Sequence, residues 1–249
     1  MENTIDVKNV TMRFIMEQER TNTLKEYAVK LLRRKLRFST FTALKDVSFT
    51  IRKGESVALI GKNGSGKSTM LKLIAGVMEP TQGSVRVQGS IAPLIELSAG
   101  FDPDLTGREN VFLNGALLGH RRKYMQENFD SIVEYAELEQ FIDVPVRSYS
   151  SGMIARLGFS IATHVQADIL VVDEVLAVGD YNFQQKCHRT MNGMLSHGKT
   201  LLFVSHDAEL VKPLCQRAIW LNRGHVMADG PSGQVCDAYL EWMKEQEEN

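Results

Sequence analysis

Hydrophobic residues along this chain follow three patterns, two of which predict strands. Residues 5–14 (IDVKNVTMRF) and 43–51 (ALKDVSFTI) alternate apolar and polar positions, which is typical of strands with one exposed face. Residues 57–60, 169–172 and 201–204 are instead uninterrupted apolar runs. Such runs favour strands that are buried on both faces, as in a parallel sheet. Together the two patterns predict an α/β fold with a mostly parallel core sheet and an N-terminal antiparallel β subdomain.

The third pattern is helical spacing, which extends from about Thr106 to Gln166. Its apolar positions form two stripes, Val111, Phe112, Leu113, Ala116 and Leu117, then Phe129, Ile132, Val133 and Ala136. Because this block interrupts the α/β pattern, we interpret it as an inserted helical subdomain at approximately residues 97–166. The remaining predicted elements are a strand at 84–88, a hairpin at 218–228 and a helix at 235–246.

A polar segment at residues 17–37 separates the two alternating strands and carries an excess of positive charge. Between Leu24 and Arg37, six lysines and arginines stand against the single acid Glu26, and the apolar residues fall at helical spacing. This is the pattern of a basic amphipathic helix, which can lie on an anionic membrane surface or dock to a membrane partner. A helix that packs on its own domain with a solvated basic face is the other interpretation, and both stay open.

Composition and charge narrow the class of protein. At 249 residues, with 43% hydrophobic and 24% charged residues, the chain fits one ordinary globular domain over residues 1–249. A formal net charge of −1 provides no general attraction to nucleic acid. The three cysteines lack metal-binding spacing and fit buried thiols in a reducing compartment. With no signal peptide and no long apolar run, we expect any membrane role to act through a partner.

Candidate chemistry begins at residues 56–69, SVALIGKNGSGKST. This is the pattern G-x-x-x-x-G-K-S between a predicted strand and a predicted helix, which is the setting that a phosphate-binding loop requires. Glycines allow successive N–H groups to point at one centre, and the helix N-terminus adds partial positive charge there. Lys67 supplies a full charge, and Ser68 supplies a hydroxyl ligand for magnesium. A plain Gly-rich turn is the alternative, which the complete GKST context disfavours. The residues that we predict to bind a nucleoside triphosphate are Gly61, Lys62, Asn63, Gly64, Ser65, Gly66, Lys67, Ser68 and Thr69.

Polar side chains follow the two other buried strands. Asp173 and Glu174 come directly after the strand at 169–172, and His206 comes after Ser205. Because ligands of an open α/β sheet bind at the carboxyl ends of its strands, we expect all three to converge on the nucleotide. Asp173 can hold magnesium, directly or through water, and Glu174 can polarise an attacking water. His206 can donate a hydrogen bond to the terminal phosphate or help to orient Glu174, although a histidine at a strand end is by itself more often structural.

A second anion-binding motif is predicted at residues 149–153, YSSGM, immediately before a helical run. Serines and a glycine at this place resemble a helix N-cap with free N–H groups. The phosphate loop already encloses its own nucleotide, and the cap lies in the inserted helical block. We therefore expect a second chain to supply the nucleotide that this cap faces. The residues concerned are Ser150, Ser151, Gly152 and Met153.

These motifs, in this order, resemble the nucleotide-binding subunit of an ATP-binding cassette (ABC) transporter, over nearly the whole chain. The signature LSGGQ of that family appears here as YSSGM, the acidic strand as ILVVDE and the switch histidine in FVSHD. The resemblance implies the ABC ATPase fold on a P-loop NTPase core, with ATP and Mg²⁺ as cofactors. It also implies a head-to-tail dimer that sandwiches two ATP molecules. The signature would then contact the γ-phosphate in trans, and Asp180 in AVGD would couple the two sites.

One position departs from the family pattern, and the identity of the adenine-stacking residue stays open. In the loop LIELSAGF, where the family usually has a magnesium-ligating glutamine, the best match is Glu96. A carboxylate can bind magnesium but adds charge beside the phosphates, so Glu96 can instead act mainly at the interface with a membrane subunit. Phe14 occupies the place of the aromatic residue that stacks on adenine. Because a long insertion follows it, Phe38 and Phe41 are alternatives.

Together, the stretches LIELSAGFDPDLTGREN, YSSGM and DEVLAVGD closely resemble the ATPases of polysaccharide exporters for teichoic acid, O-antigen or capsule. That resemblance implies two copies of a membrane permease as partners, an export function and a peripheral place at the cytoplasmic face of the (inner) cell membrane. The basic segment at 17–37 resembles an insertion of the teichoic-acid-type members. We expect no C-terminal carbohydrate-binding domain, so that the permease recognises the glycan. Another ABC exporter or importer, or a soluble ABC ATPase that acts on ribosomes or DNA, remains the alternative.

Overall fold

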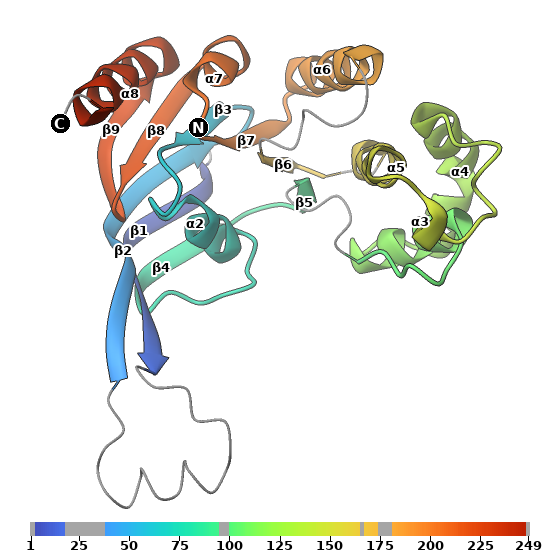
Figure 1. Cartoon of the computed structure of the whole chain (residues 1–249), viewed down its shortest axis with the longest axis horizontal. Coiled ribbons are helices and arrows are strands. Elements are labelled where there is room, and N and C mark those ends of the chain that lie inside the picture. Colours follow the sequence, from blue (N-terminus) through green and yellow to red (C-terminus); the bar gives the residue numbers. More distant parts are fainter. Residues whose placement is uncertain (1–2, 18–37, 95–99, 165–166, 174–180, 248–249) are drawn as a thin grey trace, which may run out of the picture.

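The structure of the chain is a computed structural model, shown in Figure 1. It describes residues 3–17, 38–94, 100–164, 167–173 and 181–247. Almost the whole of the predicted basic helix at 17–37 therefore lies outside the described residues. The same holds for three predicted site residues, Glu96, Glu174 and Asp180.

The core of the fold is a six-stranded sheet with the strand order β5-β6-β7-β3-β8-β9. Its strands are β3 (Ser56–Ile60), β5 (Ile91–Leu94), β6 (Ile169–Asp173), β7 (Thr200–Ser205), β8 (Arg217–Asn222) and β9 (His225–Pro231). All neighbours are parallel except β8 and β9, which form the predicted antiparallel hairpin. Every residue of β3 and β7 is buried, as their apolar runs predicted. The fold class expected from the sequence is confirmed.

Strand β5 has no counterpart in the sequence prediction. It is only four residues long and contains Pro93, which has no N–H to donate to a ladder. The strand forms nonetheless because it lies at the edge of the sheet and pairs only with β6. An edge position leaves one side of the strand without a ladder, which is where proline is tolerated.

A second sheet of three antiparallel strands has the order β2-β1-β4. Its strands are β1 (Asn3–Glu17), β2 (Phe38–Arg52) and β4 (Gln82–Val87), which confirms the strands predicted at 5–14, 43–51 and 84–88. Inward positions such as Ile5 and Val47 are fully buried, whereas Lys8 and Lys45 are exposed. In Figure 1 the paired ends of β1 and β2 extend away from the rest of the molecule.

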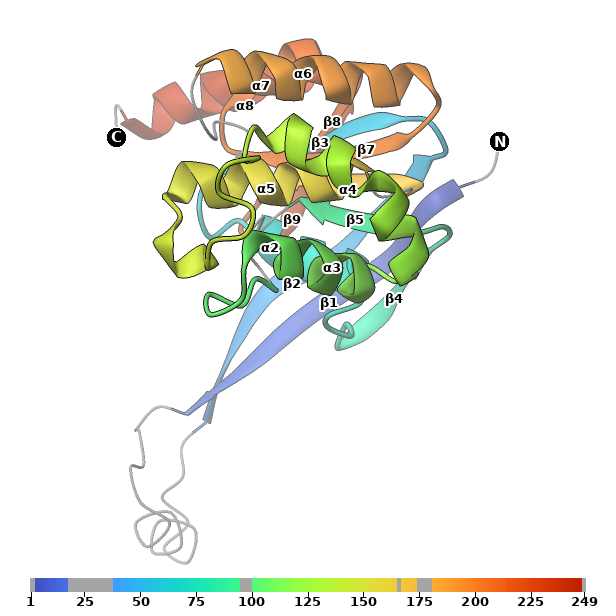
Figure 2. The ribbon, with the colours of Figure 1, turned by 90° about the vertical axis from the view of Figure 1, so that its right-hand side faces the viewer.

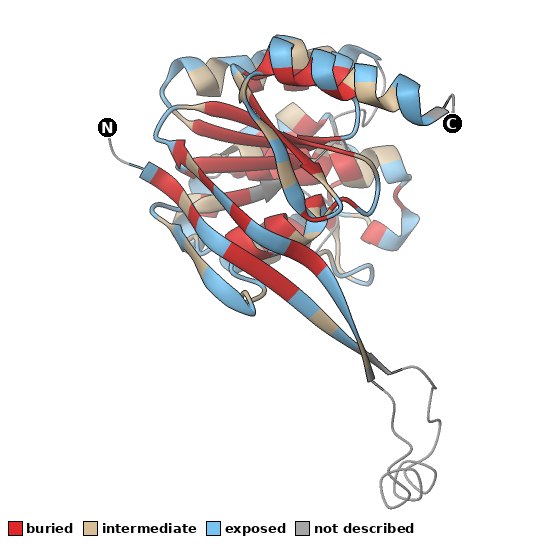
Figure 3. Ribbon diagram, turned by 90° about the vertical axis from the view of Figure 1, so that its left-hand side faces the viewer, coloured by how far each residue is buried: buried red, intermediate tan, exposed pale blue. Residues whose placement is uncertain are grey.

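The core sheet separates two hydrophobic layers, because alternate side chains of each strand point to opposite faces. In β3, Val57 and Leu59 face the three-stranded sheet and helix α2 (Lys67–Ile74), and Ala58 and Ile60 face the other way. The layer on the second face contains helices α6 (Tyr181–Ser196), α7 (Ala208–Leu214) and α8 (Ser232–Glu247), as Figure 2 shows. Figure 3 shows the core strands as buried and the outward faces of these helices as exposed.

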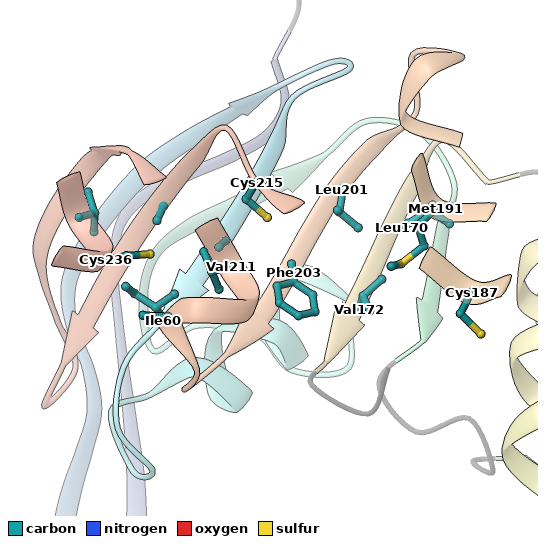
Figure 4. Packing of buried hydrophobic residues seen from close by; sticks show 14 of the residues in the cluster. Ile60, Leu170, Val172, Cys187, Met191, Leu201, Phe203, Val211, Cys215 and Cys236 are labelled. Carbon is teal, nitrogen blue, oxygen red and sulfur yellow. The ribbon is translucent and has the colours of Figure 1, made fainter. Parts of the chain in front are cut away.

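The three cysteines lie in the layer beneath α6, α7 and α8, and Figure 4 shows them among Ile60, Phe203 and their neighbours. Burial raises the pKa of the Cys187 and Cys215 thiols to about 12 and that of Cys236 to about 11. All three stay protonated at neutral pH, so they are poor nucleophiles and metal ligands. The prediction of buried thiols is confirmed.

Helices between residues 107 and 164 surround a hydrophobic cluster of their own. They are α3 (Gly107–Leu117), α4 (Arg122–Ala136), the 3₁₀ turn η1 (Val146–Ser148) and α5 (Ser151–His164). The predicted stripe of α4 is buried throughout, from Phe129 to Ala136. Among the helices that the structure describes, none has the length and apolar character needed to cross a membrane.

The predicted stripe of α3 was partly wrong. Leu117 is 64% exposed, and the buried face of α3 consists of Gly107, Asn110, Val111, Asn114 and Gly115. Asn110 is buried because its amide donates to three carbonyls, including Asp102 O at 2.9 Å, and so holds the loop before the helix. Gly115 is buried because the Met125 side chain lies against it, where a Cβ would collide. Polar satisfaction and close packing thus place Asn110 and Gly115 on this face, beside the apolar Val111.

Candidate functional site

Glycines of the loop between β3 and α2 adopt the left-handed backbone conformations that other residues disfavour. Gly66 caps α2 with φ 109°, in the left-handed region, and α2 starts at Lys67 as expected. A Cβ on Gly66 would lie 2.7 Å from Leu44 Cδ2 and 2.8 Å from Ala43 O. Position 66 therefore has room for glycine alone, and the loop can lie directly against β2.

Lys67 is almost wholly buried at the start of α2. Its ammonium donates to Gly61 O at 2.6 Å and to Lys62 O at 3.1 Å, so the charged group lies within the curve of the loop. These two acceptors are neutral carbonyls of the backbone. An anion arriving in the loop would offer this ammonium a charged acceptor, which makes stronger hydrogen bonds.

A cavity of about 210 Å³ lies at the mouth of the loop. Its lining combines the loop and the N-terminus of α2 with one strand of each sheet: Phe41, Ala43, Asn63, Gly64, Gly66, Lys67, Ser68, Thr69 and Val204. The N-terminus of a helix, a lysine and two hydroxyls are suited to phosphate. Ser68 is an exposed residue, and its hydroxyl is a hard oxygen donor of the kind that magnesium prefers. The residues present therefore fit a magnesium-bound polyphosphate.

Of the three candidate aromatic residues, the structure places Phe41 at this cavity. Phe41 is 49% exposed and lines the cavity from β2. Phe14 is its direct partner in the β1–β2 ladder, but its half-buried side chain packs against the hydrophobic layer between the two sheets. The Phe38 side chain lies outside the described part of the chain. The sequence favoured Phe14, whereas an exposed aromatic ring beside the loop favours Phe41.

The carboxyl ends of the three buried strands meet at one edge of the sheet, as predicted. β6, β7 and β3 are consecutive neighbours, with Asp173 opposite Val204 and Ser205 opposite Ile60. Val204 also lines the cavity, so the end of β7 reaches the loop. His206 follows directly and is exposed. The Asp173 side chain and Glu174 lie outside what the structure describes, and their predicted roles stay predictions.

The predicted cap of residues 150–153 is present at the start of α5. Ser150 Oγ accepts a hydrogen bond from Met153 N at 3.2 Å, and Ser150 O accepts one from Ile154 N at 3.0 Å. Ser150 is therefore the N-cap of the helix, as the sequence predicted. Ser151 is exposed and Gly152 is half-buried. The lining of the cavity at the phosphate loop contains none of these four residues.

A comparison with known families decides the assignment. The family described as "ABC transporter" matches residues 44–177, which is more than half of the chain. The chain belongs to the ABC transporter family. It is 45% identical to the O-antigen export system ATP-binding protein RfbB of Klebsiella pneumoniae, over 98% of this chain and 100% of RfbB. It is also 40% identical to the teichoic acids export ATP-binding protein TagH of Listeria innocua, over 96% of this chain and 70% of TagH.

The fold of this ABC cassette is shared with solved structures. One is described as the ATP binding subunit of an ABC transporter; it has a TM-score of 0.75 and 22% identity, over 95% of this chain and 93% of that one. Another is a dimeric ATP-binding cassette bound to ADP and phosphate, with a TM-score of 0.73 and 24% identity, over 92% of this chain and 98% of that one. Both likenesses support the architecture derived above.

Sequence reasoning missed two supports of this cassette's motifs. Gly224, in the turn between β8 and β9, donates to Ser65 O at 2.9 Å and accepts from Lys45 N at 2.9 Å, so the turn fastens the phosphate loop to β2. Tyr149 donates to Phe141 O at 2.7 Å and so anchors the chain just before the α5 cap; burial raises the pKa of this tyrosine. The sequence signals turns and helix caps at these places, and contains no sign of these partners.

Proposed function

We propose that this chain is the ATP-binding subunit of an ABC exporter. It hydrolyses ATP to drive export of a lipid-linked cell-surface polysaccharide, such as teichoic acid, O-antigen or capsule, through a separate permease. The observation that carries ATP binding is the cavity at the phosphate loop, where Lys67, Ser68 and the start of α2 meet. The export class is supported by the names of relatives at 40–45% identity, RfbB and TagH.

At the proposed site, Lys67 and the backbone of the loop bind the β- and γ-phosphates. Mg²⁺ would be held by the Ser68 hydroxyl and Asp173, and would neutralise phosphate charge there. Glu174 polarises the attacking water, and His206 contacts the γ-phosphate or orients Glu174. The parallel order β6-β7-β3 supports this assignment, because it brings the ends of all three strands to one edge.

A second copy of the chain completes each site in our proposal. The N-terminus of α5 carries the partial positive charge that favours a phosphate, yet its cap does not line the cavity of its own chain. A head-to-tail dimer brings Ser150, Ser151, Gly152 and Met153 of one copy to the ATP of the other. Asp180 then couples the two sites. The dimeric cassette of the same fold is consistent with this arrangement.

ATP-driven closure of the cassette dimer moves a permease. We propose two permease copies for each cassette dimer. The cassette lies peripherally at the cytoplasmic face of the cell membrane, and Glu96 faces the permease. The permease binds most of the glycan. The basic segment at 17–37 is a further candidate contact with membrane or permease.

Co-purification tests this assignment. We expect the tagged chain, expressed in its source and extracted with mild detergent, to carry with it a multi-spanning membrane protein and a lipid-linked glycan detectable by mass spectrometry. A chain with Lys67→Met should still co-purify with the membrane protein, because that change affects ATP and not docking. Recovery of ribosomes or nucleic acid in place of a membrane protein would refute the export assignment.

The adenine contact gives a prediction of its own. Phe41→Ala should weaken ATP binding about five- to a hundredfold, because stacking of a base on an aromatic ring contributes about 1–3 kcal/mol. Phe41→Tyr should restore the affinity measured by isothermal titration calorimetry. Phe141→Ala is the matched control, since Phe141 is 47% exposed but lies in the helical block. If the Phe41→Ala and Phe141→Ala variants bind ATP with equal affinity, Phe41 does not stack on adenine, and Phe14 or Phe38 becomes the candidate.

A further inference from the structure

Trp242 of α8 lies against the first residues of the phosphate loop. The Lys62 ammonium lies 4.8 Å from the centre of the Trp242 ring, which is the geometry of a cation–π interaction. The ring is itself held in an aromatic cluster, with ring centres 5.4 Å from Trp220 and 6.4 Å from Tyr239. Trp220 and Tyr239 are buried in the layer beneath α8, whereas Trp242 and Lys62 are half-buried. The position of the Trp242 ring is therefore determined by the core.

The same cluster reaches the loop by a second route, through the backbone. Trp220 of β8 is the ladder partner of Ile60, the last residue of β3 before the loop starts at Gly61. The aromatic cluster thus contacts the residues on both sides of Gly61. Neither contact belongs to the nucleotide cavity, whose lining includes no residue of α8 or β8.

Lys62 links this aromatic cluster to Lys67, the residue that we propose to bind the phosphates. Its carbonyl accepts two hydrogen bonds, one from Lys67 Nζ at 3.1 Å and one from Ser65 N at 3.1 Å. A bound phosphate competes with this carbonyl for the Lys67 ammonium, because a charged acceptor makes the stronger bond. Any contact that fixes the Lys62 residue therefore influences how Lys67 is presented to the nucleotide.

We propose that Trp242 is a positioning residue of the phosphate loop, whose ring holds Lys62 and so couples helix α8 to nucleotide binding. The inference rests on the proposed ATP binding and adds to it a residue of the last helix, far from the loop in the sequence. Coupling of this kind is reciprocal: if Trp242 alters nucleotide affinity through Lys62, nucleotide must alter the surroundings of Trp242. Both directions can be measured.

Intrinsic fluorescence measures the effect of nucleotide on Trp242. The chain has only two tryptophans, Trp220 and Trp242, and both lie in the cluster. We expect the non-hydrolysable analogue AMP-PNP, with Mg²⁺, to change the emission of the unmodified chain, and we expect most of that change to disappear in Trp242→Phe. In the variant, Trp220 alone reports and serves as the internal reference. Saturation should follow the affinity obtained by calorimetry.

A double-mutant cycle measures the effect of Trp242 on the nucleotide. Trp242→Leu keeps an apolar side chain but removes the π face, and should weaken AMP-PNP binding about two- to fivefold, the scale of a partly exposed cation–π pair. Trp242→Phe should restore most of the loss. In a Lys62→Met background, Trp242→Leu should have no further effect. Met243→Ala is the matched control, because this neighbour on α8 also packs half-buried against the same core.

The outcomes separate this inference from the proposed function. If the unmodified chain does not bind AMP-PNP, ATP binding itself fails. If it binds, but its emission is unchanged and Trp242→Leu has the same effect in the unmodified chain as in the Lys62→Met background, the positioning role is refuted. Equal losses in Trp242→Leu and Met243→Ala would refute it as well, since they would reflect a general loosening of α8. Melting temperatures of all variants confirm that folded proteins are compared.

Discussion

Replacement of Glu174 by glutamine should slow ATP hydrolysis about 10²–10⁴-fold, the usual scale for the loss of a general base. Glutamine keeps the size of the side chain but cannot accept the proton of the attacking water. ATP binding should persist, because we propose that the loop and Lys67, which line the cavity, make the phosphate contacts. The variant should therefore accumulate as an ATP-bound dimer. Phosphate release measures the first effect, and size-exclusion chromatography with Mg-ATP measures the second.

Glu139→Gln is the control for this experiment. Glu139 is an exposed glutamate in the segment after α4, so its replacement removes the same charge at a place remote from the proposed chemistry. Its turnover should match that of the unmodified chain. Unchanged turnover in Glu174→Gln would remove Glu174 as the base and leave His206 as the next residue to test.

Replacement of Lys67 by methionine should weaken ATP binding about ten- to a hundredfold. The ammonium lies within the loop, 2.6 Å from Gly61 O, and a hydrogen bond that involves a charged group contributes about 1.5–3 kcal/mol. Methionine retains the apolar stem and most of the volume of lysine, so the loss reflects the missing ammonium. Calorimetry with AMP-PNP gives the affinity directly. Because Gly61 O and Lys62 O also lose a donor, circular dichroism should establish that the variant is folded.

Lys72→Met provides the matched control within the same helix. Lys72 lies in the last turn of α2 and is exposed. Its replacement therefore removes the same charge at a place away from the cavity. Its affinity for AMP-PNP should equal that of the unmodified chain. If Lys67→Met binds AMP-PNP as tightly as Lys72→Met, the Lys67 ammonium does not contact the phosphates. Other residues would then have to bind them.

Elements whose cause is local could be predicted from the sequence. The start of α2 at Lys67 and the N-cap at Ser150 agree with the structure, because glycine and serine act on the backbone within a few residues. The buried parallel strands agree as well, since burial on both faces leaves an uninterrupted apolar run. Because these strands run parallel, their carboxyl ends lie at one edge of the sheet. The grouping of the strand ends at residues 60, 173 and 205 could therefore also be predicted from the sequence.

Elements whose cause lies in distant partners could not be predicted. The buried face of α3 depends on the carbonyls that Asn110 meets and on Met125 against Gly115. The helical spacing of apolar residues gives no information about either of these contacts. Strand β5 similarly depends on a place at the edge beside β6, because Pro93 alone argues against a ladder. In each case the deciding interaction joins two segments of the chain, whereas hydrophobic periodicity describes only one segment at a time.

Adjacent residues are enough to predict the candidate chemistry of this protein: a phosphate loop, an acidic strand end, a histidine and a capped anion site. Tertiary packing sets which distant residues lie beside these motifs. It brought Phe41 to the cavity, Gly224 to Ser65, and Trp242 to Lys62. The physical reason is the range of the interactions. Glycines, caps and apolar runs act on their own backbone, whereas stacking, clamping and cation–π contacts arise only when packing brings remote segments within a few ångströms.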